Sequence, residues 1–213
     1  MDPYKETFET WNKVASQYED KFMKLDLYNE TYDFICNSIT GDRANILEIA
    51  CGPGNITKYL LSKRPGFNIC GIDIAPNMIE LAKRNNPTAD FRVMDCRQID
   101  MLKTQFDGII AGFCLPYLSG SETAKLIFDS YSLLTDHGLI YLSFVEGDPN
   151  NSGFKVSSTG DRAYFYFHHL ETIKNDLEVS GFEELNMVKI TYRRSVSEEE
   201  LHTIITARKK LNN

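Results

Sequence analysis

The 213-residue chain lacks the features that mark several large classes of protein. No uninterrupted apolar run approaches the roughly 20 residues that a membrane-spanning helix needs. The first residues, MDPYKETFETW, are acidic and polar, unlike a secretory signal. Internal repeats and an interdomain linker are also missing. These absences predict one cytoplasmic domain over residues 1–213, with no membrane as a partner.

Basic residues are scarce, with 23 Lys and Arg against 30 Asp and Glu, for a net charge of −7. Nucleic-acid-binding proteins usually carry a basic face. We therefore expect a small molecule rather than a nucleic acid as the partner.

Paired cysteines and metal motifs are missing too. The five cysteines form no CxxC, and four of them lie in or beside expected strands. This pattern is typical of buried thiols in a reducing cytosol. No clustered ligands predict a metal site.

What the chain does contain, from residue 45 onward, is an alternation of short apolar runs and helical patterns. The expected strands are 45–50, 68–74, 89–94, 106–113 and 139–145, and the expected helices are 55–64, 76–85 and 121–134. Such alternation predicts βαβ units and a parallel sheet covered on both faces. Residues 146–161 are expected as a loop and 163–169 as an extended run. Helix 169–180 should precede two antiparallel strands, about 182–193 and 199–209, joined by VSEE.

Residues 4–40 show helical spacing of apolar residues and predict two helices. We expect a helical cap over residues 1–41 and a Rossmann-like core over 42–213. The aromatic stripe with Trp11 and Tyr18 fits either plain core packing or a lid over a ligand site.

The stretch ILEIACGPGNITKYL (46–60) reads as a strand, a glycine turn and a helix N-terminus. Gly52 and Gly54 permit positive φ and let backbone amides face a ligand. Asn55 is well placed to cap the helix. The dinucleotide fingerprint G-x-G-x-x-G is incomplete, because Thr57 stands where its third glycine would be.

Further polar groups follow neighbouring strands at the same predicted edge. Asp73 ends the second strand, where a carboxylate can accept hydrogen bonds from both hydroxyls of a ribose. Asp95, with the amide of Cys96 beside it, matches an adenine edge. Either aspartate could also be a simple turn residue. Together with the small residues before Phe113, these groups indicate a site for an adenosine with a polar tail and no pyrophosphate.

With these motifs the chain resembles the class I S-adenosylmethionine-dependent methyltransferases of the small-molecule type. The similar segments are ILEIACGPG, GIDIAPNMIELAKR, FRVMD, FDGIIAGFCLPYLS and TDHGLIYLSF, over about residues 45–145. The resemblance implies a three-layer α/β sandwich with a seven-stranded, mostly parallel sheet. Its order would be 3-2-1-4-5-7-6, with the last strand antiparallel. The cofactor would be S-adenosylmethionine and the product S-adenosylhomocysteine.

The resemblance also implies a set of cofactor contacts. Glu48 and the glycine loop would lie under the methionine moiety, and Asp73 would hold the ribose. Asp95 and Cys96 would read the adenine edge. The full expected set is Tyr18, Glu48, Ala50, Gly52, Gly54, Asn55, Asp73, Ile74, Met78, Asp95, Cys96, Gly112 and Phe113.

The expected acceptor pocket comprises the 146–161 loop, Tyr117, Tyr164, Tyr166 and His168. Strand alternation should place the last three on one face and Phe165 and Phe167 on the other. Methyl transfer is an in-line displacement that needs a base only for a protonated acceptor. His168, His169 and Tyr117 are the candidate catalytic groups. Alternatively, the histidines merely begin a helix and the aromatic run is a flap.

Other functions remain open at this stage. Residues 112–117, GFCLPY, lack the Asn/Asp-Pro-Pro-aromatic run of the similar enzymes that methylate base amino groups. This argues against that subclass. A non-catalytic S-adenosylmethionine-binding partner is an alternative, and a nicotinamide-dependent oxidoreductase is disfavoured by Thr57. We expect a monomer or homodimer.

Overall fold

The computed structural model describes residues 3–157, 160–193 and 199–210. Its helices are α1 (Pro3–Lys13), α2 (Ala15–Phe22), α3 (Asn29–Ser38), α4 (Asn55–Lys63), α5 (Pro76–Asn85), α6 (Gly120–Leu133) and α7 (Leu170–Ser180). Its strands are β1 (Asn45–Ile49), β2 (Asn68–Asp73), β3 (Asp90–Val93), β4 (Phe106–Ala111), β5 (Leu134–Val145), β6 (Gly153–Val156), β7 (Arg162–Phe165), β8 (Phe182–Arg193) and β9 (Glu199–Lys209). Short 3-10 helices are η1 (Cys96–Met101), η2 (Leu115–Tyr117) and η3 (Pro149–Asn151).

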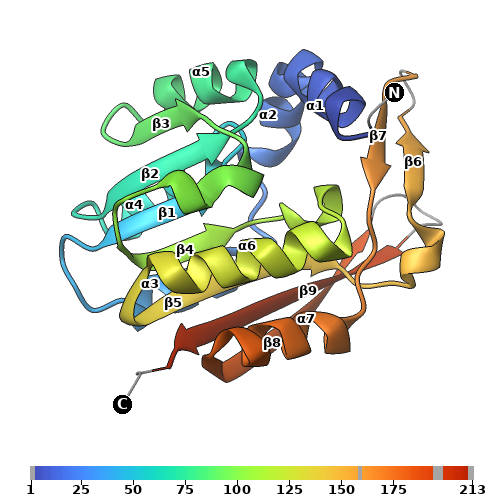
Figure 1. Ribbon diagram of the computed structural model, residues 1–213. Coiled ribbons are helices and arrows are strands. Elements are labelled where there is room, and N and C mark those ends of the chain that lie inside the picture. Colours follow the sequence, from blue (N-terminus) through green and yellow to red (C-terminus); the bar gives the residue numbers. More distant parts are fainter. Residues whose placement is uncertain (1–2, 158–159, 194–198, 211–213) are drawn as a thin grey trace.

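A seven-stranded sheet of order β3-β2-β1-β4-β5-β9-β8 forms the middle layer of a Rossmann-like sandwich (Figure 1). The first five strands are parallel, and β9 pairs antiparallel with both β5 and β8. The expected fold class is therefore confirmed, including the reversed last strand. The strands expected as the sixth and seventh of this sheet are β8 and β9, because β6 and β7 form a separate two-stranded sheet. Most of the VSEE link (196–199) lies outside the described residues.

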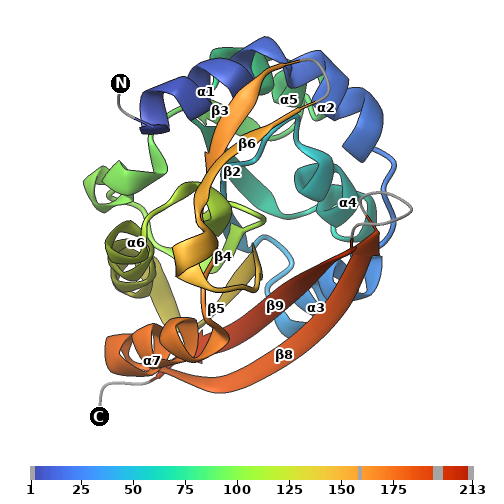
Figure 2. The same cartoon turned by 90° about the vertical axis from the view of Figure 1, so that its right-hand side faces the viewer.

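Alternate residues of the central strands pack on opposite faces of the sheet. Ile109 and Leu142 belong to a core with α6 and α7, whereas Ile110 and Tyr141 belong to a core with α3 and α4 (Figure 2). All four side chains are at most 1% exposed. Burial on both faces explains why these strands are continuous apolar runs in the sequence.

The cap contains three helices rather than the two expected. The chain bends at Val14, whose backbone is not helical (φ −93, ψ 13). The bend lets α1 pack on β7 while α2 packs on α5, and α3 lies against the sheet. Local apolar spacing could not show the bend, because it depends on where these distant partners lie.

The 146–161 segment is also more regular than expected. It contains η3 and β6, and β6 pairs with β7 in the register Phe154 with Tyr164. The backbone N–H of Tyr164 donates to Thr7 Oγ1 of α1 at 2.8 Å. This hairpin is therefore held by the cap, which a local reading of Gly, Asn and Ser residues does not show.

Candidate functional site

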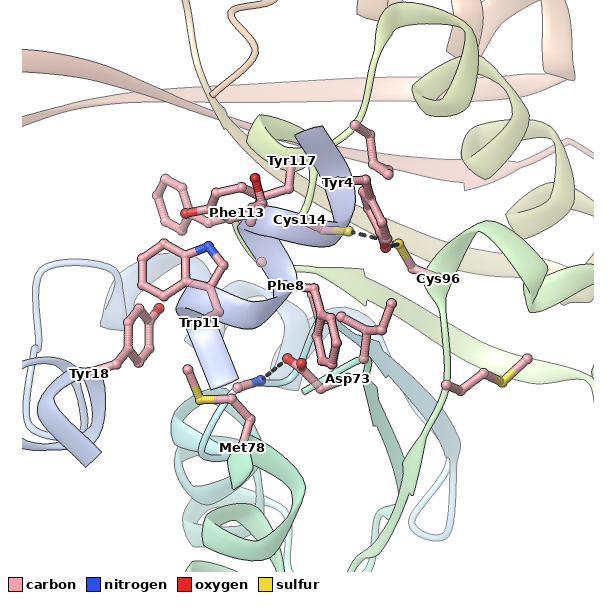
Figure 3. A pocket seen from close by; sticks show the side chains of 17 residues that line it. Tyr4, Phe8, Trp11, Tyr18, Asp73, Met78, Cys96, Phe113, Cys114 and Tyr117 are labelled. Atoms are coloured by element: carbon pink, nitrogen blue, oxygen red, sulfur yellow. Dashed lines mark hydrogen bonds between the residues drawn. The ribbon is translucent and has the colours of Figure 1, made fainter. Parts of the chain in front are cut away.

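A cavity of about 110 Å³ lies where the carboxyl ends of β1, β2 and β4 meet the cap (Figure 3). Nine of the residues expected to bind a cofactor line it: Tyr18, Ala50, Gly52, Asp73, Ile74, Met78, Cys96, Gly112 and Phe113. Four do not: Glu48, Gly54, Asn55 and Asp95. The cap adds lining residues outside the expected set: Trp11, considered above as part of a lid, and Tyr4, Thr7 and Phe8, which sequence reasoning missed. Thus β-strand ends and α1 form the site together.

The glycine loop has the left-handed backbone that its sequence predicted. Gly52 has φ +53 and Gly54 has φ +80. A Cβ on Gly54 would lie 2.4 Å from Asn86 Nδ2, so only glycine fits there. The expectation that Asn55 caps α4 was wrong. Gly54 is the N-cap residue and Asn55 is already helical, with no side-chain cap hydrogen bond.

Asp73 connects the end of β2 to the glycine loop. Its Oδ2 accepts a hydrogen bond from the Gly52 N–H at 2.9 Å, and its Oδ1 accepts one from the Ala75 N–H at 2.8 Å. Burial raises the pKa of Asp73, while these backbone N–H groups lower it. Each carboxylate oxygen has a second lone pair, so Asp73 can still accept bonds from a ligand in the cavity.

Glu48 lies beneath the loop rather than in the cavity wall. Its side chain is 1% exposed and accepts a hydrogen bond from Thr57 Oγ1. Burial raises the pKa of Glu48 to about 8, against the lowering effect of the Thr57 hydrogen bonds. Thr57, which breaks the dinucleotide fingerprint, therefore serves as the partner of a buried carboxyl group. Glu48 supports the loop from below.

The Asp95 carboxylate is bound by other parts of the chain. Arg97 donates to it through its backbone N–H at 2.9 Å and its guanidinium at 2.7 Å. Although burial would raise the pKa of Asp95, the hydrogen bonds from Arg97 hold it below its usual value. The Tyr4 hydroxyl of α1 donates to Asp95 Oδ1 at 3.0 Å and lies 3.9 Å from Cys96 Sγ. Tyr4 thus contacts the two residues that the resemblance assigns to adenine.

Three aromatic rings form the cavity wall on the cap side. Trp11 lies between Tyr18 and Tyr117, with ring centroids 5.6 and 5.5 Å away in edge-to-face geometry (Figure 3). Among the described residues, the Trp11 Nε1 atom is one of three buried side-chain polar atoms without a hydrogen-bond partner. Since a buried N–H without a partner is costly, it is a donor suited to a bound ligand.

Most of the expected acceptor residues lie away from this cavity. Tyr117 lines it, but Tyr164, Tyr166, His168 and His169 do not. Strand β7 ends at Phe165, so the predicted alternation does not continue to His168. The Tyr164 and Tyr166 rings lie 4.7 Å apart, half-buried. Phe165, expected on the face opposite to the acceptor residues, has its ring centroid 6.1 Å from that of Tyr117.

The two candidate histidines lie outside the cavity wall. His168 is 5% exposed, and its Nε2 lies 2.9 Å from the Leu115 carbonyl oxygen, to which it can only donate. Burial lowers the pKa of His168, which favours the neutral ring. His169 is exposed and is the N-cap residue of α7. The alternative that these residues only begin a helix therefore fits the geometry better.

Two negative findings apply to the described residues, 3–157, 160–193 and 199–210. They contain no cluster of three or more His, Cys, Asp or Glu side chains arranged to hold a metal ion. None of their helices has the length and apolar character needed to cross a membrane.

A Rossmann-like sheet, a glycine loop and a carboxylate at the next strand end together define a class of protein that binds nucleotide-like cofactors. Comparison with known proteins narrows this class. Residues 46–138 match the family described as "Methyltransferase domain". A malonyl-acyl-carrier-protein O-methyltransferase of Acetivibrio thermocellus is 33% identical over 106 residues, covering 48% of this chain and 36% of that protein. A tRNA N(3)-methylcytidine methyltransferase of Schizosaccharomyces pombe is 26% identical, covering 72% of this chain and 66% of that protein.

A solved structure shares the fold over nearly the full length. It is the magnesium protoporphyrin IX methyltransferase of a Synechocystis strain with bound S-adenosylmethionine, at 18% identity and a TM-score of 0.72. The match covers 99% of this chain and 98% of that chain. Residues 46–138 therefore match a methyltransferase domain, and the chain is similar to S-adenosylmethionine-dependent class I methyltransferases in sequence and fold. It spans between 36% and 66% of the length of the two curated relatives above.

Proposed function

We propose that this protein transfers a methyl group from S-adenosylmethionine to a small-molecule acceptor by in-line displacement, leaving S-adenosylhomocysteine. The observation that carries the proposal is the position of Asp73. It holds the glycine loop through Gly52 and keeps free lone pairs at an aromatic cavity. S-adenosylmethionine supplies an activated methyl group on a sulfonium when it is bound.

The residues present fit this cofactor. Asp73 suits the two ribose hydroxyls, and the unpartnered Trp11 Nε1–H offers a donor from the cap. A Cβ at Gly112 would lie 2.4 Å from Ile56 Cδ1, so the wall after β4 stays free of side-chain bulk. Aromatic faces stabilise cations, which favours a sulfonium near Trp11, Tyr18 and Tyr117. The same rings exclude water, as a displacement reaction requires.

A small acceptor is supported by the cavity and the charge. The cap covers a largely apolar cavity, and the net charge of −7 is unfavourable for nucleic acid. The malonyl-acyl-carrier-protein relative supports an acceptor that is not a nucleic acid, whereas the tRNA relative is the counterexample.

Calorimetric titration with S-adenosylmethionine, S-adenosylhomocysteine and NAD tests the proposal. We expect both adenosyl ligands to bind much more tightly than NAD, because the loop lacks the third glycine. Tighter binding of NAD would contradict the cofactor assignment. Transfer of a radiolabelled methyl group to a metabolite panel then separates a transferase from a protein that only binds the cofactor.

A further inference from the structure

Three polar side chains form a hydrogen-bonded series beside the cavity, and none of the roles above uses them. His202 lies near the start of β9 and pairs in register with Val145, the last residue of β5. It therefore lies at the same edge of the sheet as the candidate site. Sequence reasoning missed His202 because it falls inside a strand, far from every recognised motif.

The series runs from a hydroxyl to a carboxylate. The Tyr28 hydroxyl lies 2.7 Å from His202 Nδ1, and His202 Nε2 lies 3.3 Å from Glu200 Oε2. Tyr28 and His202 are 6% and 5% exposed. The Tyr192 ring stacks on the imidazole with 5.0 Å between centroids and 14° between planes. The imidazole is thus held on three sides.

Hydrogen-bond chemistry fixes the direction of this series. An ionised Glu200 has only acceptors, so the neutral imidazole must donate through Nε2–H. Nδ1 then carries the lone pair, and the Tyr28 hydroxyl donates to it. A carboxylate, an imidazole and a hydroxyl in this order turn the hydroxyl oxygen into a proton acceptor.

One aromatic ring separates the series from the cavity. Phe113 lines the cavity, and its ring centroid lies 5.2 Å from the Tyr28 ring and 4.7 Å from the His202 ring. The Phe113 backbone is fixed in a left-handed conformation (φ 54), with its N–H donating to Ser143 Oγ at 2.8 Å. The Phe113 ring is thus the group that would have to move aside for a bound acceptor to meet the Tyr28 hydroxyl.

The Tyr28 hydroxyl is neutral before the reaction. Burial raises the pKa of Tyr28 above its usual value, and nearby tyrosines and Glu200 raise it further. The groups that act on it come from several elements: Tyr18 from α2, Tyr141 from β5, Tyr192 from β8 and Glu200 from β9. A neutral phenol has a proton to pass to His202 when it receives one from a substrate.

We propose that Tyr28 accepts the proton released by the methyl acceptor, with His202 and Glu200 as positioning residues. This inference rests on the proposed function and extends it to the class of acceptor. A nucleophilic atom that carries a lone pair and loses a proton on methylation belongs to a hydroxyl or an amine. A carboxylate has no such proton and needs no relay.

The step balances in atoms and electrons. A lone pair of the acceptor's oxygen or nitrogen forms the bond to the methyl carbon, and the carbon–sulfur bond breaks with its electron pair remaining on sulfur. The acceptor's proton moves to Tyr28 Oη while the Tyr28 proton moves to His202 Nδ1. The imidazolium is stabilised by Glu200 and returns its proton to solvent after the product leaves.

Histidine side-chain ¹⁵N NMR of the whole protein tests the relay without an acceptor. At pH 7 we expect His202 in the Nε2–H form, with its resonances assigned by their loss in His202→Asn. Its Nδ1 resonance should move when S-adenosylmethionine, with a charged sulfonium, replaces S-adenosylhomocysteine, and Tyr28→Phe should remove most of this movement. Buried His168 is the internal control and should not respond.

The outcomes separate the two proposals. Failure of both adenosyl ligands to bind would overturn the proposed function. Binding of both with an Nδ1–H tautomer, or with a His202 that moves no more than His168, would overturn the relay alone.

Kinetics with a phenol, a primary amine and a carboxylate as methyl acceptors tests the acceptor class. Tyr28→Phe, which keeps the ring, and His202→Asn should lower kcat for the phenol or the amine by about 100-fold, the usual contribution of acid–base catalysis. The KM for S-adenosylmethionine should not change. Tyr59→Phe, which removes a hydroxyl that donates to Asp33 Oδ1 of α3 at 2.8 Å, is the matched control. Methylation of the carboxylate alone, or full turnover in Tyr28→Phe, would overturn the inference.

Discussion

Replacing Glu48 by glutamine should stabilise the protein increasingly as the pH rises from 5 to 8. Glu48 is 1% exposed, and burial raises its pKa from the usual 4.5 to about 8. Between these values the folded protein keeps a proton that the unfolded chain releases. The free energy of unfolding of the wild type therefore falls by about 1.4 kcal/mol per pH unit from this group alone. Glutamine does not titrate, so the free energy of unfolding of the variant does not fall for this reason.

The magnitude follows from the width of the pH window. From pH 4.5 to pH 7 the loss amounts to roughly 3 kcal/mol, and it levels off as Glu48 ionises near pH 8. The amide of the Glu48→Gln variant would still offer an oxygen to the Thr57 hydroxyl, so the variant should keep the hydrogen bond and the packing. The stability difference between variant and wild type should be small at pH 5 and largest near pH 8.

Urea denaturation at pH 5, 6, 7 and 8, followed by circular dichroism, gives this difference directly. Because only the difference in unfolding free energy between variant and wild type is used, the contributions of titrating groups that both proteins share cancel. Glu80→Gln removes the same charge from an exposed position on α5 and serves as the matched control. Parallel pH dependences for Glu48→Gln and wild type would refute the reasoning, because they would show that Glu48 is ionised in the folded protein.

Four further predictions concern the cavity and the residues around it. Asp73→Ala should weaken S-adenosylhomocysteine binding by about 1.5–3 kcal/mol in calorimetry, the range for hydrogen bonds to a charged group; unchanged affinity would make Asp73 a turn residue only. Tyr4→Phe removes the hydroxyl that donates to Asp95, so this carboxylate can accept a bond from the ligand instead. The binding of S-adenosylhomocysteine should therefore tighten by about 0.5–1.5 kcal/mol. If residues 4–22 form a lid, their backbone hydrogen exchange should slow when S-adenosylhomocysteine binds. In the ligand-free protein, their exchange should be faster in Tyr4→Phe than in the wild type. Equal exchange rates in all of these states would leave packing as the only role of the segment. His168→Asn should lower the free energy of unfolding by about 1–3 kcal/mol without changing turnover, because it leaves the Leu115 carbonyl unpaired; a large loss of turnover at unchanged stability would restore His168 as a catalytic candidate.

The sequence predicted what local patterns determine. Helix α5 was expected over 76–85 and found there, with Pro76 in its first turn, where its missing N–H costs nothing. Asp73 at the end of β2 was found from its place in the order of strand and turn. Both depend on residues within a few positions along the chain.

What the sequence did not show depends on distant contacts. Tyr4 meets Asp95 across 91 residues, and Tyr28 meets His202 across 174. No periodicity encodes such pairs. Most of the expected acceptor residues lie outside the cavity for a related reason: strand alternation holds only while a strand continues, and β7 ends before His168.

Helix α1 is tied to two structures at once. On one side Asn12 Oδ1 accepts from the Asn77 N–H at 2.9 Å, in the first turn of α5, four residues after Asp73. On the other side Thr10 Oγ1 donates to the Arg162 carbonyl at 2.7 Å, and Lys13 pairs with Asp161 at 2.6 Å. Asp161 and Arg162 lie at the start of β7.

Because one rigid helix carries both sets of bonds, loosening the hairpin also loosens the cover over the cofactor loop. Substitutions in the hairpin should therefore change how long the cofactor stays bound, even though no hairpin residue that the structure describes lines the cavity. An engineer who alters the hairpin would have to restore cofactor retention elsewhere in α1.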